Sequence, residues 1–214
     1  MESNYLSEFE IDLEQVKEHY DRRCRVANDI KELIDHNLVP GFVDLALGIS
    51  NPLGNYSAHE HQLGPQILNN HSLESVFRLA SQLNSPDLNV NHLPRTIYNA
   101  NISYLKIGVG SEIACLLQPE KFWVCNVRTL WSHLVIKHKG DWEKANEELE
   151  LYRIGDVSSE MHYQIWRDIY LSMSETLLEI NKISLIWSQE QQVQSGNLLY
   201  LWIDAVCNAL YEAD

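Results

Sequence analysis

The stretch PRTIYNANISYLKIGVGSEIACLLQPEKFWVCNVRTLWSHLVIKHKG, residues 94–140, decides the fold class. Apolar side chains recur at three- and four-residue steps from Ile97 to Leu117 and again from Phe122 to Val135. This spacing places apolar side chains on one face of an α-helix. Pro119 separates the two series, and proline suits the first turn of a helix. We therefore expect one core helix over 96–118 and a second that begins at Pro119 and ends at Gly140.

The same helical spacing recurs on both sides of this stretch. It predicts amphipathic helices over residues 5–36, 72–83, 141–153, 157–187 and 198–213. Ser72 and Asp141 are expected N-caps, and Asp156 or Ser158 is expected to cap the long helix, because short polar side chains accept hydrogen bonds from a helix start. Residues 42–49 (FVDLALGI) are apolar but too short for the period to distinguish helix from strand.

These patterns predict an all-α fold, a multi-helix bundle of about six to eight helices. Turn formers crowd the region around residues 50–71, where Asn-Pro, Gly-Pro and Asn-Asn pairs indicate an irregular loop. We expect an N-terminal helical region with polar loops over 1–90 and a helical core region over 91–214. The polar segment 84–94 is either a hinge between them or part of one continuous domain.

The charge of the chain is large and uneven. The net charge is −14, which opposes non-specific binding of nucleic acid by the whole surface. Residues 92–140 are the exception, because Glu112 and Glu120 face six lysines and arginines there, a net charge of +4. Such a basic centre between acidic ends indicates either internal ion pairs or a local anion site.

Cysteine usage and the N-terminus favour a cytoplasmic protein. The chain has four cysteines and no Cys-x-x-Cys pair, and Cys115 and Cys125 lie in apolar surroundings expected to bury their thiols. The N-terminal residues are acidic and lack the apolar core of a signal peptide. No apolar run reaches the 18 or so residues of a membrane span, so we expect no membrane partner. No motif indicates a cofactor.

Three histidines gather in the region around 50–71. His59 and His61 flank Glu60, and His71 follows the same segment. A His-x-His pair on an extended segment presents two imidazoles on one side, as a metal site requires. No cysteine or further ligand is evident nearby, so we assign no metal, and whether these histidines bind one stays open.

One short motif carries recognisable chemistry. Arg128-Thr-Leu-Trp-Ser-His133 has the Arg-x4-His spacing and the polar residue after the arginine that resemble the motif of the HEPN superfamily of helical ribonucleases. The resemblance implies metal-independent RNA cleavage, with Arg128 and His133 acting on the phosphate and the 2′-hydroxyl, usually in a site formed across a dimer. Imidazole moves protons near neutral pH, and guanidinium stabilises charge on phosphorus.

The position of this motif sets a geometric condition. Five residues on a regular helix turn through about 140°, so Arg128 and His133 do not share a face of one. The pair converges only if Arg128 lies at a helix start or if a dimer brings the two side chains together. Trp123 and Val127 instead indicate a helix that begins earlier.

The acidity and the lack of a further active-site motif favour an interaction or regulatory protein without an active site. We expect a protein partner of basic character that contacts the acidic region 141–179, and a homodimer is compatible with the pattern. The alternative is a HEPN-like, metal-independent ribonuclease that uses Arg128 and His133. Only this alternative has RNA as a partner.

Overall fold

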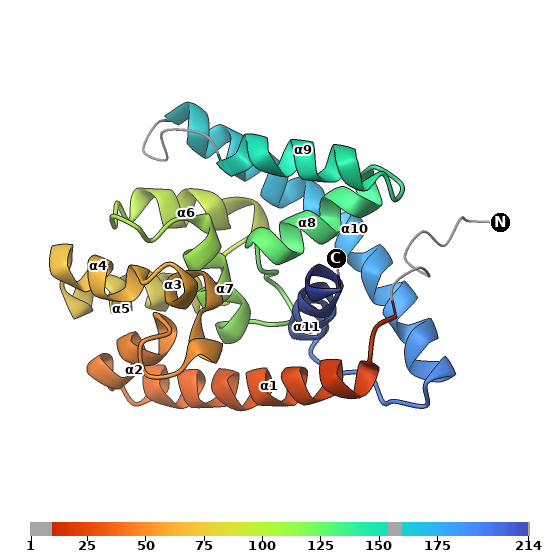
Figure 1. Cartoon of the computed structure of the whole chain (residues 1–214). Coiled ribbons are helices and arrows are strands. Elements are labelled where there is room, and N and C mark those ends of the chain that lie inside the picture. The colour runs from red at the N-terminus through yellow and green to blue at the C-terminus, as the bar shows by residue number, and fades with distance from the viewer. Residues whose placement is uncertain (1–9, 154–159, 214) are drawn as a thin grey trace. The chain divides into compact units, whose positions relative to one another are not determined.

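The computed structural model describes residues 10–153 and 160–213 (Figure 1). Within these ranges the chain forms eleven α-helices and two short 3₁₀ helices, with no strand. The bounds are α1 (Leu13–Asp35), α2 (Val39–Ala46), η1 (Pro52–Gly54), α3 (Tyr56–Glu60), α4 (Leu63–Asn70), α5 (Leu73–Leu83), η2 (Val90–His92), α6 (Leu93–Asn99), α7 (Ile107–Leu117), α8 (Val127–Lys137), α9 (Trp142–Arg153), α10 (Glu160–Glu190) and α11 (Leu199–Glu212). The all-α prediction is confirmed, but the predicted six to eight helices are too few.

The chain divides into two compact units. Asp21–Asn126 forms the inner unit, while Met1–Tyr20 and Val127–Asp214 together form the terminal unit. The expected regions 1–90 and 91–214 divide the chain elsewhere and stay a prediction. Among the described residues, no helix combines the length and the apolar character that crossing a bilayer requires.

Residues 50–71 are mostly helical, so the predicted irregular loop there is wrong. The turn formers begin helices in this region. The side chain of Asn51 accepts a hydrogen bond from the Leu53 N–H, and that of Asn55 accepts one from the Ala58 N–H, both at 3.0 Å. Side-chain oxygens satisfy N–H groups that have no partner within the first turn. Asn51 and Asn55 thereby cap η1 and α3, whereas α4 begins after Gln62 without a side-chain cap.

Other helix starts agree with their sequence signals. Residues 42–49 lie mainly in α2, whose first turn accommodates Pro40. Ser72 accepts a hydrogen bond from the Ser75 N–H at 3.3 Å, and Asp141 accepts one from the Lys144 N–H at 3.2 Å, so both predicted N-caps are confirmed. Asp156 and Ser158 lie outside the described residues.

The stretch 94–140 contains three helices rather than two. The predicted helix over 96–118 is divided into α6 and α7 by a loop at residues 100–106. Two residues of that loop, Asn101 and Tyr104, have φ values of 50° and 66°, which a continuous right-handed helix does not contain. The prediction that Pro119 begins the next helix is wrong, because α8 begins at Val127.

The segment between α7 and α8 is buried without being helical. Four apolar side chains of this segment are at most 4% exposed: Phe122, Trp123, Val124 and Cys125. The Cys125 N–H donates to the Ser111 hydroxyl at 2.8 Å, so a side chain replaces the carbonyl that a helix would supply. These residues are apolar because they are buried, not because they lie on one face of a helix. Their apolar pattern therefore resembled the start of a helix.

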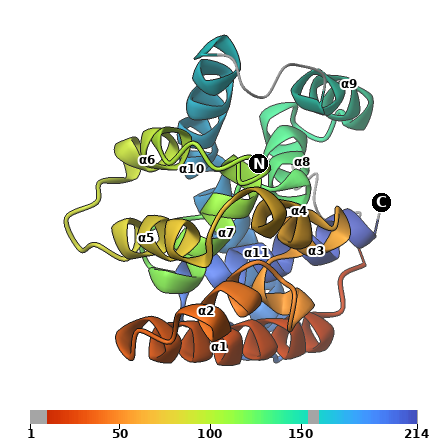
Figure 2. The ribbon, with the colours of Figure 1, turned by 90° about the vertical axis from the view of Figure 1, so that its left-hand side faces the viewer.

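In the inner unit, α2, α5 and α6 lie in a row, and α7 packs against α5 and α6 (Figure 2). The rings of Phe42 and Phe77 meet edge to face at 5.3 Å and join α2 to α5. A Cβ atom at Gly110 would lie 2.7 Å from the Ile97 side chain. Glycine at position 110 therefore permits the close approach of α7 to α6.

A fully buried carboxylate joins α3 to α7 in the inner unit. Glu112, with no exposed surface, accepts hydrogen bonds from the Tyr56 N–H at 2.7 Å and the Ser57 N–H at 3.1 Å. The Ser57 hydroxyl donates at 2.6 Å, and the Asn126 amide donates at 3.3 Å. The amide of Asn55 adds a bond to the Val109 carbonyl at 3.0 Å. Donors to the carboxylate offset the large cost of burying its charge.

In the terminal unit, α8 packs against α9, α10 and α11. The indole N–H of Trp131 donates to Asn146 at 2.9 Å, and its ring meets the rings of Trp142 and Tyr211 edge to face. The indole N–H of Trp202 donates to the Ser184 hydroxyl at 2.9 Å. These indoles have satisfied N–H groups and packed faces, as expected of core aromatic residues.

The first residues of α1 belong to the same unit. The Gln191 side chain accepts from the Leu13 N–H at 3.0 Å and donates to the Ile11 carbonyl at 2.9 Å. Tyr20 accepts the Leu198 N–H at 3.0 Å. Gly196 permits this contact, because a Cβ there would lie 2.5 Å from the Tyr20 ring. Specific polar contacts therefore hold the start of α1 to the segment after α10.

The Glu112 network predicts a stability effect. Glu112→Gln replaces one accepting oxygen by an NH₂ group that faces other donors, so at least one charge-assisted hydrogen bond is lost. We expect the free energy of unfolding to fall by about 2–3 kcal/mol. Urea denaturation followed by circular dichroism measures the change, with Glu32→Gln at an exposed position of α1 as the control. A change equal to that of the control would contradict the role given to Glu112.

Candidate functional site

Arg128 and His133 lie on α8, in the terminal unit. Arg128 is the second residue of the helix and is half-buried, whereas His133 lies in the middle and is only 2% exposed. The helix start at Val127 meets the geometric condition that the motif imposes on Arg128. The burial of His133 removes its imidazole from solvent in this chain.

The hydrogen bonds around His133 define its tautomer. The imidazole Nδ1 lies 2.6 Å from the Thr176 hydroxyl of α10, and that hydroxyl donates to the Met173 carbonyl at 2.8 Å. Because the hydroxyl has a carbonyl to donate to and Nε2 has no acceptor, we assign the ring proton to Nδ1, which donates to Thr176. The other ring nitrogen, Nε2, is then unprotonated. It is buried and has no hydrogen-bond partner among the described residues.

This environment disfavours the protonated imidazole. The pKa of His133 is lowered to about 4, chiefly by burial, with Lys137 and His138 adding to the shift and Glu148 opposing it. A proton on Nε2 would create a buried charge with no acceptor. His133 is therefore neutral at pH 7, and its lone pair does not reach solvent-borne RNA.

A more exposed ionic cluster lies at the end of the same helix. Glu148 of α9 accepts hydrogen bonds from Lys137 at 2.6 Å and from Tyr152 at 3.0 Å, and its second oxygen lies 2.7 Å from Nε2 of His138. Hydrogen bonds from Lys137, His138 and Tyr152 outweigh burial and lower the pKa of Glu148. The cluster links α8 to α9 and uses both oxygens of the carboxylate.

The other sequence candidates occupy separate positions. His59 Nδ1 lies 3.2 Å from the Gly48 carbonyl, and His71 Nε2 accepts the Ser103 N–H at 2.8 Å, while His61 is exposed. Residues 10–153 and 160–213 contain no group of three or more side chains placed to hold a metal ion. Cys115 and Cys125 are buried as expected. Burial raises the pKa of Cys125 to about 12, so its thiol is not a nucleophile near neutral pH.

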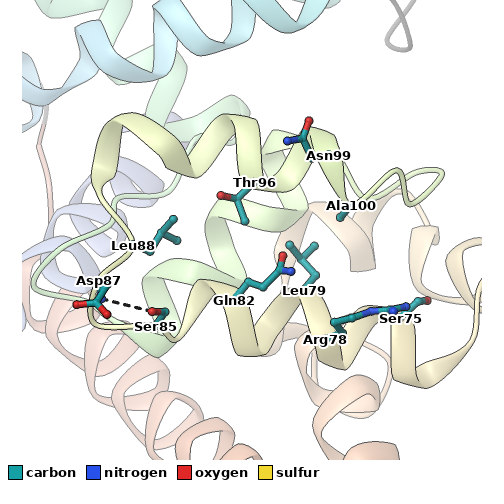
Figure 3. Close-up of a pocket in the computed structure, with 10 residues that line it drawn as sticks. All are labelled: Ser75, Arg78, Leu79, Gln82, Ser85, Asp87, Leu88, Thr96, Asn99 and Ala100. Atoms are coloured by element: carbon teal, nitrogen blue, oxygen red, sulfur yellow. Dashed lines mark hydrogen bonds between the residues drawn. The ribbon is translucent and has the colours of Figure 1, made fainter.

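The sequence did not predict a groove between α5 and α6 (Figure 3). Its volume is about 730 Å³, within the usual range of small-molecule sites. The lining residues are Ser75, Arg78, Leu79 and Gln82 of α5, Ser85, Asp87 and Leu88 of the following loop, Thr96 and Asn99 of α6, and Ala100 just after α6. In the sequence, only the polar series Ser75, Arg78 and Gln82 marks one wall, and the opposite wall becomes adjacent through folding.

The outer face of α9 forms a second candidate surface. Glu143, Glu147 and Glu150 are exposed and lie within about 60° of arc on the helix, opposite the buried Ala145 and Leu149. We name these three glutamates the acidic stripe. Leu151 follows it at 69% exposure.

Exposed apolar side chains also occur on α10. Leu178, Leu185 and Ile186 are 38%, 39% and 54% exposed. Leu178 and Leu185 are seven residues apart, so they lie on nearly the same face of the helix. Exposed leucines and carboxylates together are suited to binding another protein chain.

No family model, curated protein or solved structure matches this chain.

The buried imidazole predicts a specific pH dependence. Between pH 6.5 and 4 the unfolded chain binds a proton at His133 that the folded chain does not bind, so stability falls as the pH falls through this window. We expect a loss of about 2 kcal/mol between pH 7.5 and 5. His133→Asn keeps a donor for Thr176 but removes the titration, so its stability should vary less over this range.

Urea denaturation at several pH values measures the slope. His61→Asn, at an exposed position, should keep the wild-type slope. Equal slopes for wild type and His133→Asn would contradict the assignment of a buried neutral imidazole.

Proposed function

We propose that this protein is an interaction or regulatory protein whose acidic stripe on α9 contacts a basic protein partner. The observation that carries the proposal is the arrangement of Glu143, Glu147 and Glu150 on one exposed face. Carboxylates on one side of a rigid helix attract lysine and arginine side chains and orient the approaching partner. The exposed Leu151 beside them offers apolar area to the same partner.

The energetics favour a combined polar and apolar contact. One exposed ion pair contributes at most about 1 kcal/mol, so the stripe provides orientation and association rate more than affinity. Burial of exposed leucines supplies affinity, at roughly 25 cal/mol per Å² of apolar surface. The exposed Leu178, Leu185 and Ile186 of α10 belong to the same unit and are further apolar surface in it.

Charge reversal tests this surface. In the triple variant Glu143→Lys/Glu147→Lys/Glu150→Lys, attraction to a basic partner becomes repulsion. We expect recovery of basic partners by in-cell crosslinking to fall about tenfold or more, because three pairs of up to 1 kcal/mol each are lost. The control is Asp29→Lys/Glu32→Lys/Asp35→Lys on α1, which changes the net charge equally at exposed positions.

The control variant should recover the same partners as the wild type. If the α9 variant also recovers them at the wild-type level, the acidic stripe is not the contact surface. If both triple variants lose them equally, the effect is one of total charge, and the proposal fails as well.

The ribonuclease remains the alternative, and the position of Arg128 in the first turn of α8 favours it. Burial of His133 opposes it, since a general base must come within hydrogen-bond reach of its proton. The test is cleavage of single-stranded RNA in EDTA by wild type, His133→Ala and His138→Ala. The interaction proposal predicts no cleavage above background by any of them. Cleavage that is lost only in His133→Ala would replace it by the ribonuclease.

A further inference from the structure

The outer face of α10 carries three leucines at seven-residue steps. Leu171 is half-buried, and Leu178 and Leu185 are 38% and 39% exposed. Seven residues make nearly two helical turns, so these side chains lie within about 40° of arc along about 21 Å of the helix. Apolar side chains at this repeat are typical of a helix that packs lengthwise against another helix. We name these three residues the leucine stripe.

The leucine stripe is not the face by which α10 packs inside the terminal unit. α10 contacts α8 and α11, and its fully buried Met173 and Ile180 lie at least about 120° of arc from every leucine of the stripe. The Ser184 hydroxyl, which accepts the indole N–H of Trp202 from α11, is also fully buried. The stripe is therefore additional apolar surface that the packing of α10 against α8 and α11 does not use.

One acidic and one basic side chain border the leucine stripe. Glu175 and Lys182 are both exposed and lie with the three leucines within about 80° of arc. Neither forms an ion pair or a hydrogen bond with another residue of the ranges 10–153 and 160–213. Seven residues separate the two by about 10.5 Å along the helix axis, so they do not pair with each other. α10 therefore presents an unused carboxylate and an unused ammonium group beside its exposed leucines.

A second copy of α10 matches this pattern when it runs antiparallel to the first about a two-fold axis at Leu178. Leu178 then lies beside Leu178 of the second copy, and Leu171 lies beside Leu185 of the second copy. The same rotation brings Glu175 to within about 1.5 Å, the rise of one residue, of the level of Lys182 in the second copy. Symmetry repeats this match on the other side of the axis. A parallel pair would instead place Glu175 beside Glu175 and Lys182 beside Lys182, so charge favours the antiparallel pair.

We propose that two copies of this chain associate through antiparallel α10 helices, with the leucine stripes in contact and an ion pair between Glu175 and Lys182 on either side of Leu178. The partner is a second copy because α10 itself carries both the leucine repeat and the opposite charges at matching levels. This contact does not use the acidic stripe on α9 and goes beyond the proposed function.

The dimer is expected to be weak. One pair of helices forms a contact below the standard interface size, and the net charge of −14 on each copy opposes association. We therefore expect a Kd of roughly 10–100 µM.

Sedimentation equilibrium of the full-length protein, from about 5 µM to about 1 mM, measures the Kd of the dimer. Leu178→Glu places two carboxylates side by side at the two-fold axis, so we expect the Kd to rise at least about tenfold. Leu151→Glu makes the same change at an exposed position of α9 outside the stripe and should leave the Kd unchanged. Because both leucines are exposed, neither variant should lose helix content by circular dichroism.

Charge reversal tests the antiparallel arrangement. Glu175→Lys and Lys182→Glu should each raise the Kd about tenfold, because two exposed ion pairs are lost and each contributes up to about fivefold. The double variant Glu175→Lys/Lys182→Glu should restore the wild-type Kd, since each copy again supplies both charges at matching levels.

Controls at exposed positions of α1 separate the contact from the net charge. Glu32→Lys and Arg22→Glu make the same changes in net charge and should alter the Kd less than about twofold. Glu175→Lys is the most informative variant, because a less acidic chain would by itself associate more tightly, whereas the proposed contact predicts weaker association.

A dimer that Leu178→Glu and both single charge variants weaken, and that the double variant restores, supports the proposal. A protein that stays monomeric up to about 1 mM overturns it, also when Leu178→Glu abolishes binding of a different protein, because the stripe then belongs to that protein. A dimer that tolerates Leu178→Glu forms through another surface. A Glu175→Lys variant that associates as tightly as the wild type, or a double variant in which the two losses add, contradicts the antiparallel contact.

Discussion

The buried carboxylate of Glu112 is the interaction on which the inner unit depends. A short helix such as α3 is not stable alone, because forming a first turn costs more than its few hydrogen bonds return. The Glu112 oxygens accept the N–H groups of Tyr56 and Ser57, so a side chain of α7 satisfies the start of α3. The same carboxylate binds the Asn126 amide, and one charged group thereby joins three segments that are distant in sequence.

The sequence predicted helices wherever one face alone was apolar. The spacing over 72–83 and 157–187 identified α5 and α10, and short polar side chains identified two N-caps. The sequence-based prediction of helices failed where a segment is buried on all sides. Phe122, Trp123 and Cys125 are buried in a non-helical segment whose Cys125 N–H pairs with a side chain, and periodicity does not distinguish such a segment from a helix. Around Asn51 and Asn55, the caps of short helices were interpreted as loop signals.

The candidate sites were less predictable than the fold. The Arg-x4-His spacing is local, but its chemistry depends on the exposure of His133, which is determined by Thr176 and other packing 43 residues away. The groove between α5 and α6 depends on two helices that meet only after folding. By contrast, the acidic region 141–179 was evident from charge counting, because charge on an exposed helix needs no partner elsewhere in the chain. Sequence therefore predicts surfaces within one helix better than sites built from several.

Amide hydrogen exchange at Tyr56 and Ser57 tests the central claim most directly, because both N–H groups donate to Glu112. The account predicts that these two amides, although they lie in the first turn of a five-residue helix, exchange as slowly as amides in the middle of α7. Exchange at the rate of an unstructured peptide would contradict it. In that case Glu112 would not hold α3 against α7.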